Sequence, residues 1–168
     1  MIRSYARLWP VLLCLLLFAS ACRRDKPSVP VAIVGAFSEE IEMLTGSLKD
    51  AHTLEVMGMN FYRGKLEGRE VIIANTGIGK VNAAMTTAIL LQAFRPSGVI
   101  FTGIAGGINP ELKPADLIVA QRCVHHDLNY IYDDTLISYQ PANPLTGLKN
   151  PVFFQSDSML LRLAEKAA

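Results

Sequence analysis

Three short apolar runs, each followed by a glycine-containing segment, constrain the fold of this chain most strongly. The runs are Val31–Val34, Val71–Ala74 and Gly98–Thr102. A continuous apolar run of four or five residues is typical of a strand buried on both faces, as in a parallel sheet covered by helices. Because such sheets bind ligands at the carboxyl ends of their strands, the glycine-containing segments are expected to lie at a functional edge.

Helical patterns alternate with these strands. After Ser38, which is expected to cap a helix, apolar residues recur at helical spacing at Ile41, Leu44 and Leu48. A second helix is expected over Lys80–Phe94, which is rich in Ala and Leu and is followed by Pro96. Strands that alternate with helices favour an α/β fold with a mixed, largely parallel central sheet.

Further elements are expected around this alternation. Phe61–Leu66 and Val71–Ala74 flank Glu67-Gly68-Arg69, which predicts a hairpin. Leu117–Ala120 is interpreted as a fourth buried strand, and residues 125–150 as a loop broken by prolines. Asp157 is expected to cap a last helix that runs to Ala168.

The N-terminus has the organisation of an export signal. Arg3 and Arg7 precede an 11-residue apolar run, Leu8–Phe18, which is too short to span about 30 Å of hydrocarbon. Small residues at 19–21 then precede Cys22, as in a bacterial lipobox. We therefore expect a lipoprotein-type signal peptide over 1–21, a polar tether over 22–30 and one domain over 31–168, anchored by lipid at Cys22 on the exported side of a membrane. The alternative is an ordinary signal peptide in which Cys22 carries no lipid.

Composition excludes several classes of protein. The chain has 168 residues, with 16 Lys and Arg against 15 Asp and Glu, so its net charge is +1. Lys and Arg are scattered rather than clustered, which gives no reason to expect a nucleic-acid partner. A content of 51% hydrophobic and 18% charged residues excludes a disordered chain.

The residues that could hold a cofactor or metal do not form a known pattern. A Walker loop would need Gly in place of Ala74 and Ser or Thr in place of Val81, and the dinucleotide fingerprint would need Gly in place of Asn82. Thr76–Lys80 is therefore interpreted as a tight turn that packs a helix on the sheet. His125, His126 and Asp127 are adjacent and do not converge on one ion, so no metal and no cofactor are expected, while Cys123 is expected to be a buried apolar residue.

Two of the strand-end segments carry residues suited to chemistry. Glu39, Glu40 and Glu42 open a helix, where carboxylates compensate the macrodipole, but a carboxylate just past a buried strand is also well placed for a general base. The glycines of Gly103–Gly107 let the backbone approach a flat ligand closely, or simply form a tight loop.

Taken together, these segments resemble bacterial 5′-methylthioadenosine/S-adenosylhomocysteine nucleosidases, which are members of the nucleoside phosphorylase superfamily. The resemblance rests on VGAFSEEI at 34–41, TGIGKVNAA at 76–84 and TGIAGG at 102–107, with further matches at 112–119 and at His126-Asp127. It implies a three-layer phosphorylase/nucleosidase-like fold, a homodimer and a purine nucleoside substrate whose N-glycosidic bond is hydrolysed to release adenine.

The resemblance also implies roles for individual residues. Glu40 is the carboxylate that activates the attacking water, Phe37 lies near the sugar, and Ile104, Ala105 and Gly106 line the adenine and ribose pocket. Phosphorylases of the superfamily typically place Arg at the position of Phe101 and Ser or Thr at that of Ile104, where these groups hold phosphate. Because neither side chain here is a donor, water is the expected nucleophile.

The resemblance covers the N-terminal part of the family domain. In the family, a second half brings the Glu that binds the ribose hydroxyls and the Asp that protonates the purine, and neither has a counterpart in these 168 residues. The chain is thus expected to be C-terminally incomplete and to have little activity alone. The alternatives to a nucleosidase are a non-catalytic purine-nucleoside-binding lipoprotein and an interaction protein built on this scaffold.

Overall fold

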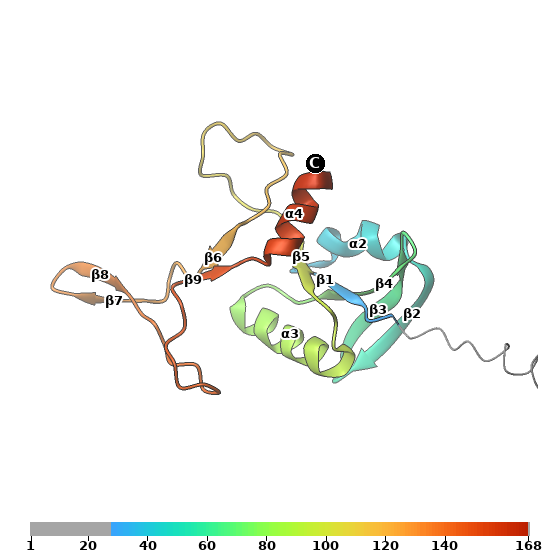
Figure 1. Ribbon diagram of the computed structural model, residues 1–168, viewed down its shortest axis with the longest axis horizontal. Helices are drawn as coiled ribbons and strands as arrows, with labels where there is room; N and C mark the ends of the chain where they lie inside the picture. The colour runs from blue at the N-terminus through green and yellow to red at the C-terminus, as the bar shows by residue number, and fades with distance from the viewer. Residues whose placement is uncertain (1–27, 168) are drawn as a thin grey trace, which may run out of the picture. The chain divides into compact units, whose positions relative to one another are not determined.

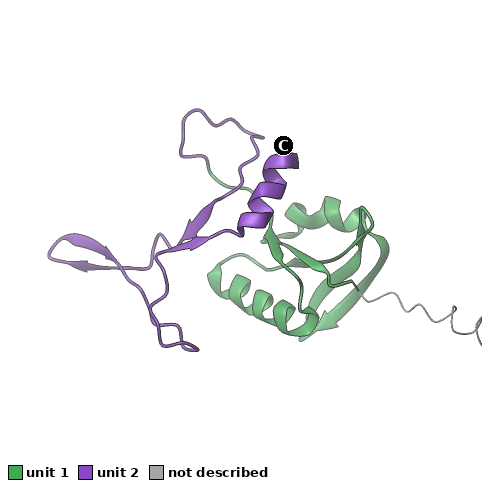
Figure 2. Cartoon of the chain, viewed as in Figure 1, with its two compact units in different colours: residues 1–106 green, residues 107–168 purple. Residues whose placement is uncertain are grey.

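The computed structural model describes residues 28–167, and they fall into two compact units (Figure 2). The first unit ends at Gly106 and the second begins at Gly107. The predicted signal peptide over 1–21 and the lipidation site Cys22 lie outside the described residues. No helix in the described part of the chain is long and apolar enough to cross a membrane.

The first unit is built on a five-stranded sheet with the order β2-β3-β4-β1-β5 (Figure 1). Strand β1 lies between β4 and β5 and is parallel to both, whereas β2, β3 and β4 form an antiparallel meander. The elements of this unit are β1 (Val31–Gly35), α2 (Ser38–Gly46), β2 (Lys49–Val56), β3 (Met59–Leu66), β4 (Arg69–Asn75), α3 (Lys80–Phe94) and β5 (Val99–Phe101). The predicted mixed sheet is confirmed, and its parallel part comprises β4, β1 and β5.

Two helices cover opposite faces of this sheet, which gives three layers (Figure 1). On the α3 side, Leu90 packs with Phe61 and Ile72, and all three side chains are fully buried. On the α2 side, Ile41 packs with Val71 and Ile73. Side chains alternate between the two faces along a strand, so successive residues of β4 supply both cores.

Several sequence predictions are confirmed in this unit. The run Val31–Val34 forms β1, the helix expected over Lys80–Phe94 has those bounds, and β3 and β4 form the expected hairpin around Glu67-Gly68. Residue Arg95, which follows α3, adopts a left-handed conformation with φ of 46°, and its amide donates to Leu91 O. Pro96 comes directly after it, so the helix ends where the sequence indicates.

Three predictions in this unit are wrong. The helix expected to include Leu48 ends at Gly46, although Leu48 still packs against the core on the α2 side. Ser38 does not cap α2: Phe37 is the N-cap residue, and the Ser38 hydroxyl instead accepts a hydrogen bond of 3.3 Å from Asn75 Nδ2. The strand expected to be buried over 98–102 is exposed over most of β5, because among the described strands only β1 pairs with it. Phe101 at its end is 61% exposed.

The second unit holds two separate two-stranded sheets and one helix. Strands β6 (Arg122–Val124) and β9 (Phe153–Gln155) pair with each other, as do β7 (Asn129–Tyr132) and β8 (Thr135–Ser138). The helix α4 (Ser158–Ala167) follows Asp157, whose Oδ1 accepts bonds of 2.9 Å from the amides of Met159 and Leu160. The predicted cap at Asp157 is therefore confirmed.

Three other predictions for this unit are wrong. Leu117–Ala120 is not a strand but an exposed segment, because the pairing with β9 begins only at Arg122. Residues 125–150, predicted to be a loop, contain the β7–β8 hairpin, whose positive-φ turn residues are Asp133 and Asp134. Cys123, predicted to be buried, is exposed, because among the described strands β6 pairs only with β9.

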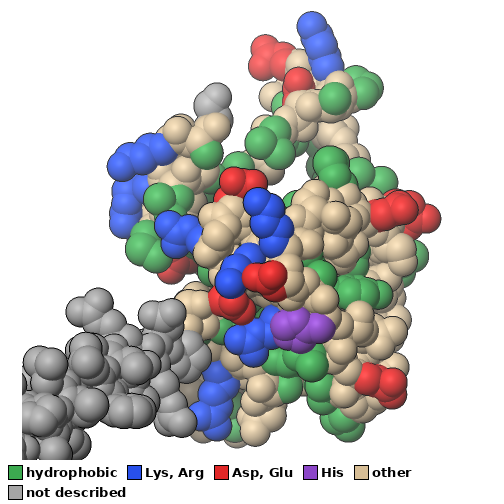
Figure 3. Space-filling view, turned by 90° about the vertical axis from the view of Figure 1, so that its right-hand side faces the viewer, with side chains coloured by type: hydrophobic (Ala, Val, Ile, Leu, Met, Phe, Trp, Pro, Cys, Tyr) green, Lys and Arg blue, Asp and Glu red, His purple; other side chains and the backbone are tan. Residues whose placement is uncertain are grey.

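Charged side chains of both signs are interspersed over the molecular face that Figure 3 shows. Two ion pairs link neighbouring strands of the first unit: Arg63 Nε lies 3.3 Å from Glu70 Oε2, and Lys65 Nζ lies 3.2 Å from Asp50 Oδ2. Partly exposed pairs of this kind contribute about 0–1 kcal/mol each to stability.

Candidate functional site

The carboxyl ends of β4, β1 and β5 lie side by side because the three strands are parallel neighbours. The backbone continues this pairing past the strands. The amide of Thr76 donates to Gly35 O at 2.8 Å, and the amide of Thr102 donates to Val34 O at 2.8 Å. The three glycine-containing segments predicted to meet at a functional edge therefore follow adjacent strand ends.

The Glu40 carboxylate joins two of these segments. Glu40 stands in the first turn of α2, and its half-buried side chain points back toward β1. Its Oε2 accepts a hydrogen bond of 2.6 Å from the amide of Ala36, and its Oε1 accepts one of 3.0 Å from the amide of Ile104. Hydrogen bonds from backbone amides to a carboxylate are charge-assisted, so both the position and the orientation of this side chain are fixed.

This arrangement suits a general base. A base must be held within hydrogen-bond reach of the proton that it removes, and rigid backbone donors hold a carboxylate better than flexible side chains do. The two amides each engage one carboxylate oxygen, and each oxygen has a second lone pair that can accept a proton or bind water. Glu40 thus combines a fixed position with a free acceptor site.

The other predicted site residues lie around Glu40 in different ways. Phe37 is half-buried and holds the extended N-cap position of α2, three residues before Glu40. Ile104 contributes its amide to Glu40, while its side chain is 83% exposed. Ala105 and Gly106 follow directly and are exposed. The structure thus brings Glu40 and Ile104 into contact, and the substrate-binding roles of these residues remain predictions.

The segment after β4 forms a turn that fixes α3 on the sheet. Gly77 and Gly79 have φ of 77° and 98°, values at which a side chain would be strained. The amide of Gly77 donates to Asn75 Oδ1 at 2.9 Å, and Asn82 Nδ2 donates to Ile78 O at 2.8 Å. Buried Thr86 on α3 donates to Thr76 O at 3.2 Å. These contacts match the interpretation of Thr76–Lys80 as a tight structural turn.

Asn75 links the end of β4 to α2, and the sequence analysis assigned it no role. Its Oδ1 binds the amide of Gly77, while its Nδ2 donates to the Ser38 hydroxyl on α2. An Asn that follows a strand and precedes Thr-Gly is typical of an Asx turn, and this pattern could have indicated the first contact. The second contact depends on the pairing of β1 with β4 and has no local sequence pattern.

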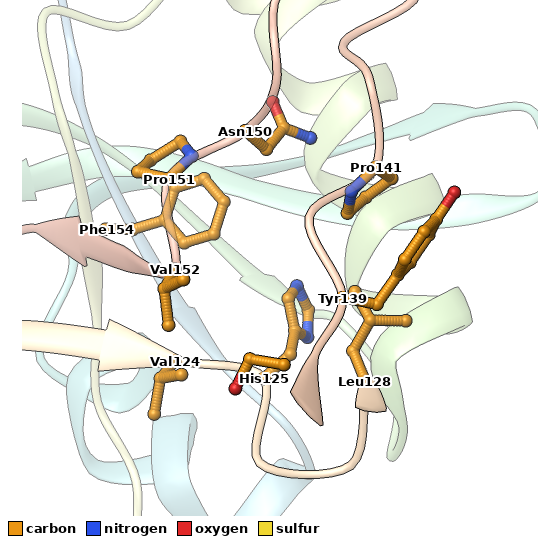
Figure 4. A pocket seen from close by; sticks show the side chains of 10 residues that line it. Val124, His125, Leu128, Tyr139, Pro141, Asn150, Pro151, Val152 and Phe154 are labelled. Carbon is orange, nitrogen blue, oxygen red and sulfur yellow. The ribbon is translucent and has the colours of Figure 1, made fainter. Parts of the chain in front are cut away.

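Two hollows are lined by residues other than Glu40. A cavity of about 60 Å³ in the second unit is lined by His125, Tyr139, Phe154 and neighbouring residues (Figure 4). The His125 ring packs edge-on against Phe154 with 6.1 Å between ring centroids. A surface cleft of about 440 Å³ in the first unit lies between α2 and β3 and includes Glu42 and Tyr62. Within the described residues no cluster of three or more His, Cys, Asp or Glu could hold a metal ion.

Comparison with known proteins places this geometry in a family. A model of the phosphorylase superfamily matches residues 30–168. The 5′-methylthioadenosine/S-adenosylhomocysteine nucleosidase of Lysinibacillus sphaericus is 39% identical over 137 residues, which are 82% of this chain and 56% of that protein. The chain therefore spans little more than half the length of the curated relatives that it matches.

Solved structures agree with this assignment. The nucleosidase of Colwellia psychrerythraea in complex with adenine superposes with a TM-score of 0.72 at 35% identity, over 83% of this chain and 55% of that chain. The nucleosidase of Neisseria meningitidis in complex with methylthio-immucillin-A gives a TM-score of 0.69 at 32% identity, over 83% of this chain and 57% of that chain. The predicted phosphorylase/nucleosidase-like fold is confirmed, and the chain belongs to the phosphorylase superfamily.

Proposed function

We propose that this chain carries the water-activating carboxylate of a nucleosidase that hydrolyses the N-glycosidic bond of 5′-methylthioadenosine and S-adenosylhomocysteine. The observation that carries the proposal is the Glu40 carboxylate, which the amides of Ala36 and Ile104 hold at the joined ends of β1 and β5. Relatives named as nucleosidases for these two substrates support it, as does the binding of adenine in a similar structure.

The chemistry needs one base and one site for the leaving group. The bond between C1′ of the ribose and N9 of adenine breaks, and the electron pair leaves with the purine. The ribose then has oxocarbenium character, which a nearby carboxylate stabilises. Glu40 takes one proton from the attacking water as its oxygen bonds to C1′, and the departing adenine takes up one proton. Phe37, Ile104, Ala105 and Gly106 are the proposed contacts for the nucleoside.

Two exposed apolar side chains favour water over phosphate as the nucleophile. Phe101 ends β5 and is 61% exposed, and Ile104 is 83% exposed in the loop that follows. Neither side chain can donate a hydrogen bond to an anion. A phosphate dianion brought to this edge would lose its hydration without a compensating side-chain donor from either position.

Adenine release from methylthioadenosine should therefore be independent of phosphate. The protein that carries this sequence is assayed with and without inorganic phosphate, and adenine is measured by chromatography. We expect equal rates in both conditions. A rate that requires phosphate would contradict the proposed hydrolysis, and nucleoside binding without any adenine release would favour a non-catalytic binding protein.

We also propose that the protein is a homodimer. Exposed apolar side chains on the β7–β8 hairpin support this, since Ile131, Tyr132 and Leu136 are each more than 60% exposed. Apolar groups gathered on one exposed element commonly mark a site of protein association. Sedimentation velocity of the purified protein is expected to give the mass of a dimer, and a monomer at all concentrations tested would contradict the proposal.

Export and lipid anchoring are proposed from the N-terminal sequence. Basic residues, an 11-residue apolar run and small residues precede Cys22, which is the order of a lipoprotein signal. We expect Cys22→Ser to move the protein from the membrane fraction to the soluble fraction, because one thiol carries the whole anchor. Cys123→Ser is the matched control and should leave the distribution unchanged. Retention of Cys22→Ser in washed membranes would contradict a lipid anchor.

A further inference from the structure

Glu40 lies against Gly35 and Gly103. Because Gly103 has no side chain, the Glu40 carboxylate can occupy the space beside it. A methyl group placed on Gly103 would lie 2.7 Å from Glu40 Oε1, 3.1 Å from Glu40 Cδ and 3.1 Å from Phe101 Cε1. Cβ atoms do not approach an oxygen as closely as 2.7 Å in folded proteins. We propose that Gly103 is a positioning residue, which keeps the Glu40 carboxylate on the Ile104 amide by offering no side chain. Its effect on turnover rests on the proposed function.

The backbone of Gly103 does not itself demand glycine. Positive φ occurs at Gly77 and Gly79, whereas Gly103 has no such conformation. An alanine could therefore adopt the same backbone, and the only conflict is with the side chains that it meets. Gly103 follows β5 in an exposed segment, so a methyl group there disturbs no buried core. Substitution at Gly103 thus separates an effect on Glu40 from an effect on folding.

The carboxylate is the group that would move. The carboxylate is the end of a flexible side chain, whereas the added methyl group would be fixed to the backbone that follows β5. Moving Oε1 away from the methyl group also moves it away from the Ile104 amide, which lies 3.0 Å from it. The amide of Ala36 donates to the other carboxylate oxygen, Oε2, whereas Oε1 is the atom nearest to the added methyl group. Gly103→Ala is expected to break one of the two anchors of Glu40.

Substitution at Gly35, the other glycine beside Glu40, would have a different effect from substitution at Gly103. A methyl group on Gly35 would meet Ile41 Cγ2 at 2.8 Å and Glu40 Cβ at 3.0 Å. Ile41 is buried in the core beneath α2, so Gly35→Ala would displace the helix as well as the carboxylate. Gly103 is therefore the position at which the Glu40 carboxylate can be displaced without displacing α2, and its other close neighbour is the exposed ring of Phe101.

The first test needs no catalysis. The Ile104 amide is followed by ¹⁵N NMR in the full chain, with and without Glu40→Ala, in the native background and in the Gly103→Ala background. In the native background, loss of Glu40 should shift the Ile104 resonance and speed its hydrogen exchange, because its acceptor is removed. In the Gly103→Ala background, Glu40→Ala should have no further effect on this amide. An equal effect of Glu40→Ala in both backgrounds would overturn the proposal.

The second test measures turnover. Gly103→Ala should lower kcat for adenine release by roughly 10²-fold with KM little changed, since displacing a reacting group by about 1 Å has that consequence. Gly46→Ala, at the end of α2 with no atom within 4 Å of the added methyl group, is the matched control and should leave kcat unchanged. The melting temperature of Gly103→Ala should stay near that of the native chain.

A double-mutant cycle separates positioning from general damage. Glu40→Asp shortens the side chain by one methylene, so its carboxylate does not reach the methyl group that Gly103→Ala adds. Gly103→Ala should therefore not lower kcat any further in the Glu40→Asp background. If the reduction of kcat in the double variant equals the product of the two single reductions, the proposal is overturned. A fall in melting temperature large enough to account for the lost activity would also overturn it. If the protein that carries this sequence releases no adenine, the proposed function fails, while the NMR cycle on the 168-residue chain still decides the role of Gly103.

Discussion

Glu40→Gln should lower the rate of adenine release from methylthioadenosine by about 10²–10⁴-fold while nucleoside binding largely survives. Glutamine keeps the shape of the side chain, and its carbonyl oxygen can still accept a hydrogen bond from Ala36 or Ile104. The substitution removes the negative charge and the proton acceptor that the proposed mechanism assigns to Glu40. Steady-state kinetics and equilibrium binding of the nucleoside measure the two effects separately.

Glu39→Gln provides the matched control for this experiment. Glu39 lies in the same first turn of α2 and is exposed, whereas Glu40 is half-buried. Removing its charge changes the interaction with the helix dipole by about 0.3–1 kcal/mol and should leave turnover near the native rate. Equal losses in both variants would indicate an effect on the helix, and full activity in Glu40→Gln would contradict its role as the base.

Phe61→Ala should lower the free energy of unfolding by about 3–5 kcal/mol. Phe61 lies in the middle of β3 and has no exposed surface, and its ring packs against Phe94 at a centroid distance of 5.0 Å. It also contacts the cluster of Ile72 and Leu90 that holds α3 on the sheet. Truncation would leave a cavity where strand and helix meet. Urea unfolding followed by circular dichroism measures the change.

Met43→Ala serves as the comparison, because Met43 is an apolar residue on α2 that is 81% exposed. Substitutions at exposed positions of this kind usually change stability by no more than about 0.5 kcal/mol. A loss below about 1 kcal/mol in Phe61→Ala would show that the core on the α3 side of the sheet contributes less than its burial indicates.

The parts of the fold that the sequence predicted are those encoded locally. Val31–Gly35 is apolar without interruption, and the helix Lys80–Phe94 ends just before Pro96, so both elements could be placed from their own residues. Strand β2 was not predicted, because five of its eight residues are exposed in succession and its apolar residues Leu54 and Val56 come at the end. This segment is a strand because its backbone pairs with β3, and its composition does not indicate that pairing.

Composition was misleading where an element lacks neighbours. Leu117–Ala120 has the residues of a buried strand, yet in the described part of the chain it pairs with no strand and lies exposed. Phe101 and Cys123 are exposed for the related reason that β5 and β6 each pair with a single described strand. Whether a residue is buried depends on the strands and helices that pack against it, and its own residue type does not determine these neighbours.

The candidate site was predictable in its residues but not in its contacts. Glu40 was singled out because it follows a buried strand and matches the motif of a family. Its partner Ile104 lies 64 residues away, and only the parallel pairing of β1 with β5 brings the two together. The space at Gly103 depends on the same pairing. The sequence thus indicated the candidate base, and the strand pairing shows which backbone amide holds its carboxylate.

The sugar product formed from methylthioadenosine in saturating phosphate tests the central claim most directly. Mass spectrometry of the product distinguishes the free pentose from its 1-phosphate, and the same sample of Glu40→Gln shows whether the product depends on the carboxylate. Water activated by Glu40 predicts free methylthioribose and adenine in equal amounts, with both reduced together in Glu40→Gln. Formation of the pentose 1-phosphate, or of free pentose at the native rate in Glu40→Gln, would contradict the account.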